Sequence, residues 1–185
     1  MNEYEKTKNN KALKFARSHI EWLKVNSAKY SANASWGVNF KLAIDKNLEY
    51  PSETGYSTVT PYILEALVKY TQLTKDKQYI TLIESIYRFI DEDLKIMYST
   101  ENEEAKSYGP LRDRIVTNSN SYTMYSYALM LDFTMETNYT KQKILKLYNF
   151  ISNQQKEDGS WLYEPFSKQS FIDCFHTCFI LKNII

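Results

Sequence analysis

The sequence predicts an all-α fold in which antiparallel helical hairpins form part of an α/α toroid. Three observations support this prediction. Tyr87-Arg88-Phe89-Ile90 matches Tyr148-Asn149-Phe150-Ile151 at a spacing of 61 residues, and similarity at a fixed period indicates repeated structural units. Apolar residues recur at i, i+3, i+4 and i+7 in all four helices of the two central hairpins, as in a helix with one buried face. Connectors of three or four residues within each pair favour antiparallel neighbours.

Two complete hairpins are predicted in the middle of the chain. The first covers residues 62–94 and has its polar break at Lys75-Asp76-Lys77. The second covers residues 122–151 and has its break at Asn138-Tyr139-Thr140. Apolar periodicity predicts one further helix near each end of the chain, so that six helices are expected.

The two outer helices each match only half of a hairpin. Residues 12–23 resemble the second helix of an earlier pair, and residues 170–185 resemble the first helix of a later pair. Hairpins in such arrays cover their apolar faces with the next hairpin. Flanking segments, a second subunit or further parts of a larger toroid would cover the two open faces, and we expect a homodimer. The length of 185 residues predicts a single domain over residues 1–185.

Composition and short motifs exclude several classes of function. The net charge is +1 and the basic residues are scattered, which disfavours a nucleic-acid partner. The apolar runs are shorter than the ~20 residues that cross a bilayer, and the polar N-terminus does not resemble a signal peptide, so we expect a cytoplasmic protein without a membrane partner. No phosphate loop, zinc signature or nucleophile elbow is present, and we expect no cofactor or metal. Cys174 and Cys178 lack a second pair and are expected to be reduced, buried small hydrophobic residues.

Three long connectors between the hairpins are rich in aromatic and polar residues, and they cover residues 26–57, 98–118 and 158–170. Because they occupy the same place in the repeat, we expect all three at one end of the bundle, where they would line a ligand cleft. The 16 tyrosines of the chain leave two interpretations open. Their rings either pack in the core with the hydroxyl at its rim, or line the cleft and stack on sugar faces.

The last connector contains the clearest motif, Gln155-Lys156-Glu157-Asp158-Gly159-Ser160-Trp161. It resembles the QxxDGSW repeat of terpene cyclases and other α/α-toroid proteins, in which Gln and Trp tie a helix end to the next turn. The resemblance implies a structural role. Gly159 can adopt a positive φ and suits a helix C-cap.

Asp173 and His176 follow at the start of the last helix, and their i,i+3 spacing puts them on one face. A carboxylate beside an imidazole can orient it for general acid or base catalysis. The alternative is a first-turn Asp stabilised by the helix dipole and a His bonded to a loop carbonyl.

The middle connector supplies two arginines, Arg112 and Arg114. They either hold the carboxylate of an acidic sugar in bidentate fashion or form salt bridges with Asp113 or with glutamates of the loops. Asn118 or Ser119 is expected to cap the following helix.

The first connector contains Trp36-Gly37 and the segment 50–56. Glu53 lies among aromatic residues just before a helix. It is a candidate acid or ligand contact, or else a carboxylate that stabilises the helix N-terminus.

The order and spacing of these motifs over residues 30–185 resemble bacterial α/α-toroid proteins found with polysaccharide-biosynthesis genes, and more distantly the helical domain of glucuronyl C5-epimerases. The resemblance implies a carbohydrate-active protein in which tyrosines and a carboxylate move a proton at C5 of a uronic acid. The β-rich domains of the epimerases have no counterpart here, and six helices are too few for a closed toroid. The candidate catalytic residues are Glu53, Tyr108, Tyr163, Asp173 and His176, and the candidate substrate contacts are Trp36, Tyr56, Arg112, Arg114, Asn118 and Trp161.

The leading hypothesis is therefore a protein of polysaccharide or glycan biosynthesis that handles a uronate or another acidic sugar by proton transfer, without metal or nucleotide. A non-catalytic glycan-binding or scaffold subunit is the first alternative. The second is a glycoside hydrolase, which needs two carboxylates about 5–5.5 Å or about 6.5–9.5 Å apart. Glu53, Asp113, Glu164 and Asp173 are the carboxylates available for it.

Overall fold

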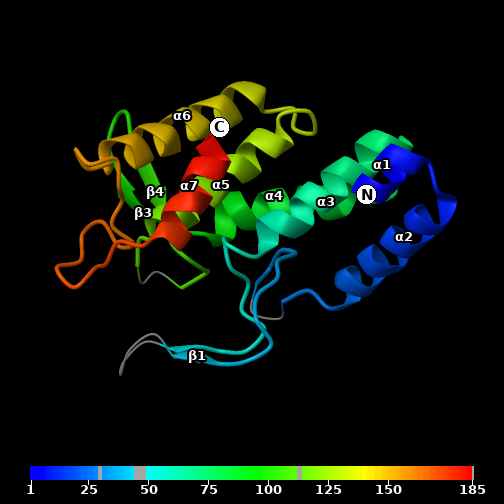
Figure 1. Ribbon diagram of the computed structural model, residues 1–185, viewed down its shortest axis with the longest axis horizontal. Helices are drawn as coiled ribbons and strands as arrows, with labels where there is room; N and C mark the ends of the chain where they lie inside the picture. The colour runs from blue at the N-terminus through cyan, green and yellow to red at the C-terminus, as the bar shows by residue number, and fades with distance from the viewer. Residues whose placement is uncertain (29–30, 44–48, 112–113, 185) are drawn as a thin grey trace.

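The computed structural model is mostly helical, with seven α-helices and two small sheets among the residues that it describes, 1–28, 31–43, 49–111 and 114–184. Figure 1 shows α6 along one side, α5 and α7 beside it, and α1 and α2 at the opposite end next to α3. The elements are α1 (Asn2–Thr7), α2 (Asn10–Val25), β1 (Leu42–Ala43), β2 (Glu49–Tyr50), α3 (Thr60–Thr74), α4 (Ile80–Arg88), the π-helical turn η1 (Phe89–Asp93), β3 (Ile96–Ser99), β4 (Glu104–Lys106), α5 (Thr117–Met130), α6 (Thr137–Asn153) and α7 (Cys174–Ile184).

The two hairpins predicted in the middle of the chain are present as α3–α4 and α5–α6. Helix α3 ends where Lys75 adopts a left-handed conformation and donates its amide to the carbonyl of Thr71. The apolar stripes of these helices meet in one core, which includes Leu64, Ile86 and Phe150. Helix α5 is central because it contacts α3, α6 and α7.

The expectation of one buried face is wrong for α5, which is buried around most of its circumference. Its first turns are rich in small polar residues, and residues 117–121 are all buried. Several of the hydroxyls of α5 are satisfied within the helix, since Thr123 donates to the carbonyl of Ser119 at 3.1 Å and Ser126 to that of Tyr122 at 2.8 Å. Buried polar groups with such partners cost little stability.

The first two long connectors have secondary structure of their own, which was not expected. In the first, β1 pairs with β2 in antiparallel register. In the middle connector, β3 pairs with β4 through a bulge, and all three residues of β4 are buried. Strands of two to four residues carry too little periodicity to be recognised in a sequence.

The structural role predicted for the Gln155–Trp161 motif is confirmed. The indole of Trp161 is 5% exposed and donates to the carbonyl of Ile151 in the last turn of α6, at 2.8 Å. Gln155 donates its side-chain amide to the carbonyl of Gly159 at 3.0 Å. Gly159 has a φ of 84° but lies in the turn after the helix, so the C-cap prediction is wrong and Gln154 holds that position.

The cap predicted for α5 is also wrong, because Asn118 and Ser119 both lie inside its first turn and neither caps it. The backbone of the last connector takes over this role. Thr117 donates its amide to the carbonyl of Tyr163 at 2.9 Å and its hydroxyl to the carbonyl of Leu162 at 2.7 Å. The start of α5 is therefore fixed to residues 162–163.

The outer helices bury less than the sequence predicts. Helix α2 buries only Ile20 and leaves Phe15 and Trp22 exposed. In α7, Cys174 and Cys178 are exposed, so the expectation that they are buried is wrong. None of the described helices is long and apolar enough to span a membrane.

Candidate functional site

The N-terminal ends of α3, α5 and α7 gather at one place, as expected for the three long connectors. Ser57, just before α3, lies 2.7 Å from Ser119 in α5, hydroxyl to hydroxyl. The amide of Ser57 also donates to the carbonyl of Tyr108 in the middle connector, at 3.1 Å. Tyr163 of the last connector contacts both Thr117 of α5 and His176 of α7.

A continuous group of aromatic and charged side chains links these ends, and we call it the tyrosine–histidine cluster. The Tyr56 and Tyr108 rings lie 5.3 Å apart, centroid to centroid. The Arg114 guanidinium lies 4.6 Å from the Tyr108 centroid and 5.6 Å from the Tyr163 centroid. The Tyr163 ring is in turn 4.5 Å from the imidazole of His176. The cluster consists of Tyr50, Tyr56, Tyr108, Arg114, Tyr163, Glu164, Phe171, Asp173 and His176.

Arg114 is the polar centre of this cluster. Its Nη1 donates to Glu164 at 3.0 Å, and its Nη2 donates to the Tyr163 hydroxyl at 3.2 Å. Of the two interpretations of Arg114, the geometry matches the salt bridge with a loop glutamate. Burial raises the pKa of Tyr163, and the nearby positive charge of Arg114 opposes that rise. Arg114 therefore orients the Tyr163 hydroxyl and favours its ionisation.

Asp173 and His176 form a close pair at the start of α7. The imidazole Nδ1 lies 2.7 Å from Oδ2 of Asp173, and the backbone amide of His176 donates to Oδ1 at 2.7 Å. The hydrogen bond from the backbone amide of His176 is the main reason why the pKa of Asp173 is lowered. The hydrogen bond with the imidazole lowers this pKa further. Asp173 thus acts in both ways considered from the sequence: it caps the helix and it orients the ring. With the proton of the neutral ring on Nδ1, Nε2 carries the lone pair of a general base.

The cluster has a buried side and an accessible side. Tyr56 is 1% exposed and packs behind Tyr108, so it offers no face to a sugar. The side chains of Asp173 and His176 are 36% and 25% exposed. An open depression of about 280 Å³ borders Arg114 and Glu164. The accessible side of the cluster therefore includes Arg114, Glu164 and His176, and of these only Arg114 and Glu164 line the depression.

Two predicted substrate contacts, Trp161 and Asn118, are buried away from this side of the cluster. Trp161 is held in the core, and Asn118 is 5% exposed inside α5, so neither is available to a ligand. Arg112 lies outside the described residues. Phe171 was not predicted as a site residue, yet its ring stacks on Tyr163 at 4.8 Å and is exposed. The sequence feature that could have identified Phe171 as a site residue is its position two residues before Asp173.

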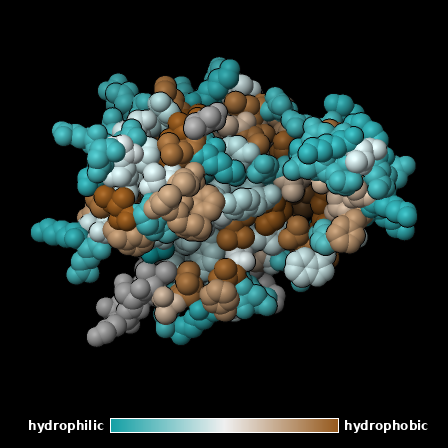
Figure 2. Space-filling view, in the orientation of Figure 1, coloured by the Kyte–Doolittle hydropathy of each residue, from teal (hydrophilic) through white to brown (hydrophobic). Residues whose placement is uncertain are grey.

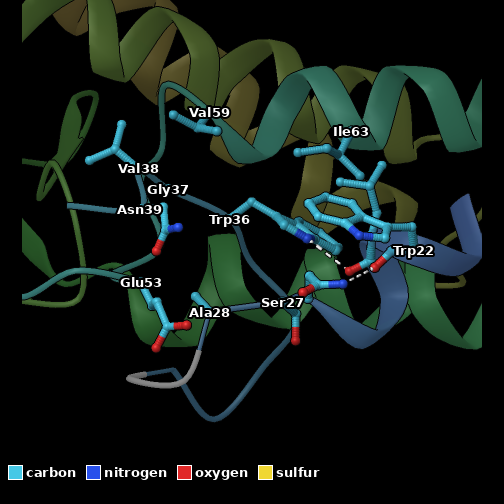
Figure 3. Close-up of a pocket in the computed structure, with 12 residues that line it drawn as sticks. Trp22, Ser27, Ala28, Trp36, Gly37, Val38, Asn39, Glu53, Val59 and Ile63 are labelled. Carbon is cyan, nitrogen blue, oxygen red and sulfur yellow. Dashed lines mark hydrogen bonds between the residues drawn. The ribbon is translucent and has the colours of Figure 1, made fainter. Parts of the chain in front are cut away.

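Trp36 and Glu53 line a separate pocket of about 300 Å³ between the end of α2 and the start of α3. Figure 3 shows Trp22 and Trp36 at one end of this pocket and Glu53 at the other. Figure 2 shows the same region as a hollow lined by apolar residues. The indole of Trp36 donates to the carbonyl of Leu23 and is 5% exposed, whereas Trp22 is 61% exposed. Trp22 is thus the more accessible aromatic residue here, and the sequence did not single it out.

Glu53 has a backbone conformation that is unusual for a residue with a side chain. Its φ is 64°, and its amide donates to the carbonyl of Val38 at 3.1 Å. Gly37 lies against the same segment, since a Cβ there would be 1.7 Å from the carbonyl oxygen of Thr54. Such backbone strain persists only where the surroundings enforce it. The segment 53–56 therefore links the pocket, through Glu53, to the tyrosine–histidine cluster, through Tyr56.

No protein-family model matches the chain, and no curated protein matches it. Within the described ranges, no group of three or more His, Cys, Asp or Glu residues is placed to hold a metal ion. The chemistry of the cluster and of the pocket is therefore the basis for a functional assignment.

Proposed function

We propose that this protein acts on carbohydrate and that the tyrosine–histidine cluster binds a uronate or another acidic sugar and transfers a proton at its ring. The observation that carries the proposal is the His176–Asp173 pair, 2.7 Å apart, with the Tyr163 ring 4.5 Å from the imidazole. An oriented imidazole beside a tyrosine ring, whose hydroxyl accepts from Arg114 at 3.2 Å, provides one base and one acid in the same cluster.

The reaction is an exchange of the proton at the carbon next to the sugar carboxylate. Nε2 of His176 takes this proton, and the electron pair of the broken C–H bond is delocalised onto the carboxylate. The Tyr163 hydroxyl then gives a proton to the same carbon, and delivery to the opposite face inverts the centre. His176 releases its proton to solvent and the Tyr163 oxygen takes one up from solvent, which restores both groups. Arg114 supports both steps, since it holds the Tyr163 hydroxyl and stabilises negative charge nearby.

Charge favours an acidic ligand at this position. The N-terminal ends of α3, α5 and α7 meet there, and the positive ends of helix dipoles attract anions. Glu164 occupies one side of the Arg114 guanidinium. In this proposal the sugar carboxylate takes the place of Glu164 on Arg114, because both bind the guanidinium in the same way.

The hairpin order supports a partial α/α toroid. Helix α5 lies between α3 and α7, and α4 and α6 pair with α3 and α5. In this arrangement α3, α5 and α7 are the inner helices, and the ligand binds at their N-terminal ends. A role in polysaccharide biosynthesis in the cytoplasm is part of the same proposal.

The test is proton exchange between sugar and solvent. The protein is incubated in D2O with uronate-containing oligosaccharides and, in parallel, with neutral ones, and the ring protons are followed by NMR. We expect the proton next to the carboxylate to be lost from a uronate, and the loss to slow at least about tenfold in His176→Gln and Tyr163→Phe, as for removal of a general acid or base. Tyr148→Phe, at an exposed position on α6, is the matched control. Exchange at the wild-type rate in both site variants would reject the assignment.

The Trp22–Trp36 pocket favours a second candidate function, which is glycan binding without catalysis. Exposed tryptophan rings stack on sugar faces, and Trp22 is exposed at the pocket. This candidate predicts that Trp22→Ala abolishes glycan binding while His176→Gln leaves it unchanged. The hydrolase alternative has less support, since Glu164 is paired with Arg114 and Glu53 lines the other pocket. Asp113 lies outside the described residues.

A further inference from the structure

The outward face of α7 is apolar and carries two thiols. Cys174, Cys178 and Leu181 are one turn apart along this face, and Phe175 flanks them with 65% of its surface exposed. The opposite face packs inward through Ile180. Figure 1 shows α7 on the near side of the molecule, and Figure 2 shows apolar surface at the same place. A helix that is apolar on both faces is normally covered on both.

The two thiols have the spacing of a metal-binding pair. Their sulfur atoms lie 3.6 Å apart. In a tetrahedral zinc site with Zn–S bonds of about 2.3 Å, neighbouring sulfurs are about 3.8 Å apart. A zinc ion can therefore bridge Cys174 and Cys178 with a shift of only a few tenths of an ångström.

The chain supplies only half of such a site. Structural zinc requires four ligands, and no third His, Cys, Asp or Glu joins the thiols in the part of the chain that the structure describes. His176 is turned to the other side of α7, where Asp173 holds its Nδ1. The missing ligands must come from outside.

We propose that Cys174 and Cys178 form half of a tetrathiolate zinc site, which a second copy of this chain completes across a two-fold axis. A two-fold contact brings the same patch of each copy together, so each copy supplies two sulfurs. Phe175 and Leu181 are then buried around the metal. Binding releases the four thiol protons to solvent and leaves four thiolates on one Zn2+.

A second copy accounts for both features of this face at once. An apolar partner of another kind would cover Phe175 and Leu181 but would leave the thiols without a function. A metal bound by one chain would leave the apolar residues in water. The thiols do not touch the sugar site, but Phe175 lies against the imidazole of His176, with ring centroids 5.1 Å apart, so the two proposals are tested by separate variants.

The test is a titration of the reduced full-length protein with Zn2+, and with Co2+ as a spectroscopic probe, while the mass in solution is measured by light scattering. We expect one metal ion for two chains, the mass of a dimer, and the absorption of tetrahedral Co2+–thiolate. The double variant Cys174→Ser/Cys178→Ser should lose all three, and a chelator should return the wild type to monomers. Because both positions are exposed, the variant should fold normally.

Three results would overturn the proposal. One is the absence of metal binding at micromolar metal. Another is one ion per chain on a monomer. The third is a dimer that persists in the double variant, which would assign the face to apolar pairing alone.

Discussion

Two polar clusters of the molecule differ in their access to solvent. The tyrosine–histidine cluster lies at the N-terminal ends of three helices and is partly exposed. The other, which we call the buried lysine cluster, surrounds β4 and η1. It consists of Asp91, Glu104, Lys106, Tyr127 and Lys143.

Every charged group of the buried lysine cluster has a protein partner. Lys106 is 1% exposed, and its Nζ donates to the carbonyls of Asp91 at 2.7 Å and Leu94 at 3.3 Å. Lys143 pairs with Glu104 at 2.7 Å, and Tyr127 donates to Asp91 at 2.7 Å. Burial lowers the pKa of Lys106 to about 8. Through its hydrogen bonds to the two carbonyls, Lys106 caps the C-terminal end of η1.

The comparison shows that a shifted pKa is not sufficient evidence for a site. Perturbed pKa values and π-helical turns both occur often at functional sites, and by these criteria the buried lysine cluster would be the first choice. A ligand cannot reach Lys106, however, because its side chain is buried and its Nζ already donates to two carbonyls. The tyrosine–histidine cluster has an accessible imidazole instead, so we assign stability to the first cluster and chemistry to the second.

Breaking the buried ion pair should have the largest effect. We expect Glu104→Gln to lower the free energy of unfolding by about 3–5 kcal/mol, because Lys143 is left as a buried charge without its partner. Urea unfolding measures this. The double variant Glu104→Leu/Lys143→Met should lose less than the single one. Equal losses would show that shape rather than charge dominates.

The second largest effect is the contribution of Lys106 to the pH dependence of stability. Its pKa is about 8 in the folded protein and 10.5 in a model compound, so the unfolded chain binds more protons between these values. The stability of the wild type should therefore rise with pH in this window, by up to about 3 kcal/mol from this group. Unfolding curves from pH 7.5 to 9.5 test this against Lys106→Met, which should lack the rise. If the stability of both proteins changed with pH in the same way, the rise could not be assigned to Lys106.

The smallest of these effects concerns the tryptophans. Trp161→Phe removes the indole hydrogen bond to the Ile151 carbonyl, which keeps the Gln154 amide as a second donor at 3.2 Å. We therefore expect a loss of about 0.5–1.5 kcal/mol, the net contribution of one hydrogen bond. Trp22→Phe is the control, since this exposed ring should change stability by less than about 0.5 kcal/mol. Thermal unfolding followed by circular dichroism measures both. A larger loss for Trp22→Phe would mean that α2 is held by this ring.

The sequence predicted the elements that depend on regular periodicity. The 61-residue spacing located both hairpins. The motif around Trp161 predicted that this residue contacts the end of the preceding helix, α6. Exposure was harder to predict, since the apolar pattern around Cys174 and Cys178 is the same whether a helix face is covered or open. Lys106 was missed because lysine is almost never fully buried without partners, and its partners are backbone carbonyls without a sequence signal.

The candidate site was predicted in part for a similar reason. Asp173 directly precedes α7 and His176 lies in its first turn, so their spacing gave their geometry. The contact of Arg114 with Glu164 and Tyr163 joins positions about fifty residues apart, and only the fold brings them together. Trp36 and Glu53 were grouped with them, although they line a separate pocket.

The most direct test of the assignment of chemistry to the tyrosine–histidine cluster uses the imidazole NMR signals. The chain has only two histidines. His176 lies in the proposed site, whereas His19 lies on α2, where its Nδ1 is 2.8 Å from the carbonyl oxygen of Phe15. We predict that a uronate oligosaccharide shifts the ring signals of His176, assigned with His176→Gln, and leaves those of His19 unchanged. A sugar that binds the protein without moving the His176 signals would contradict the central claim.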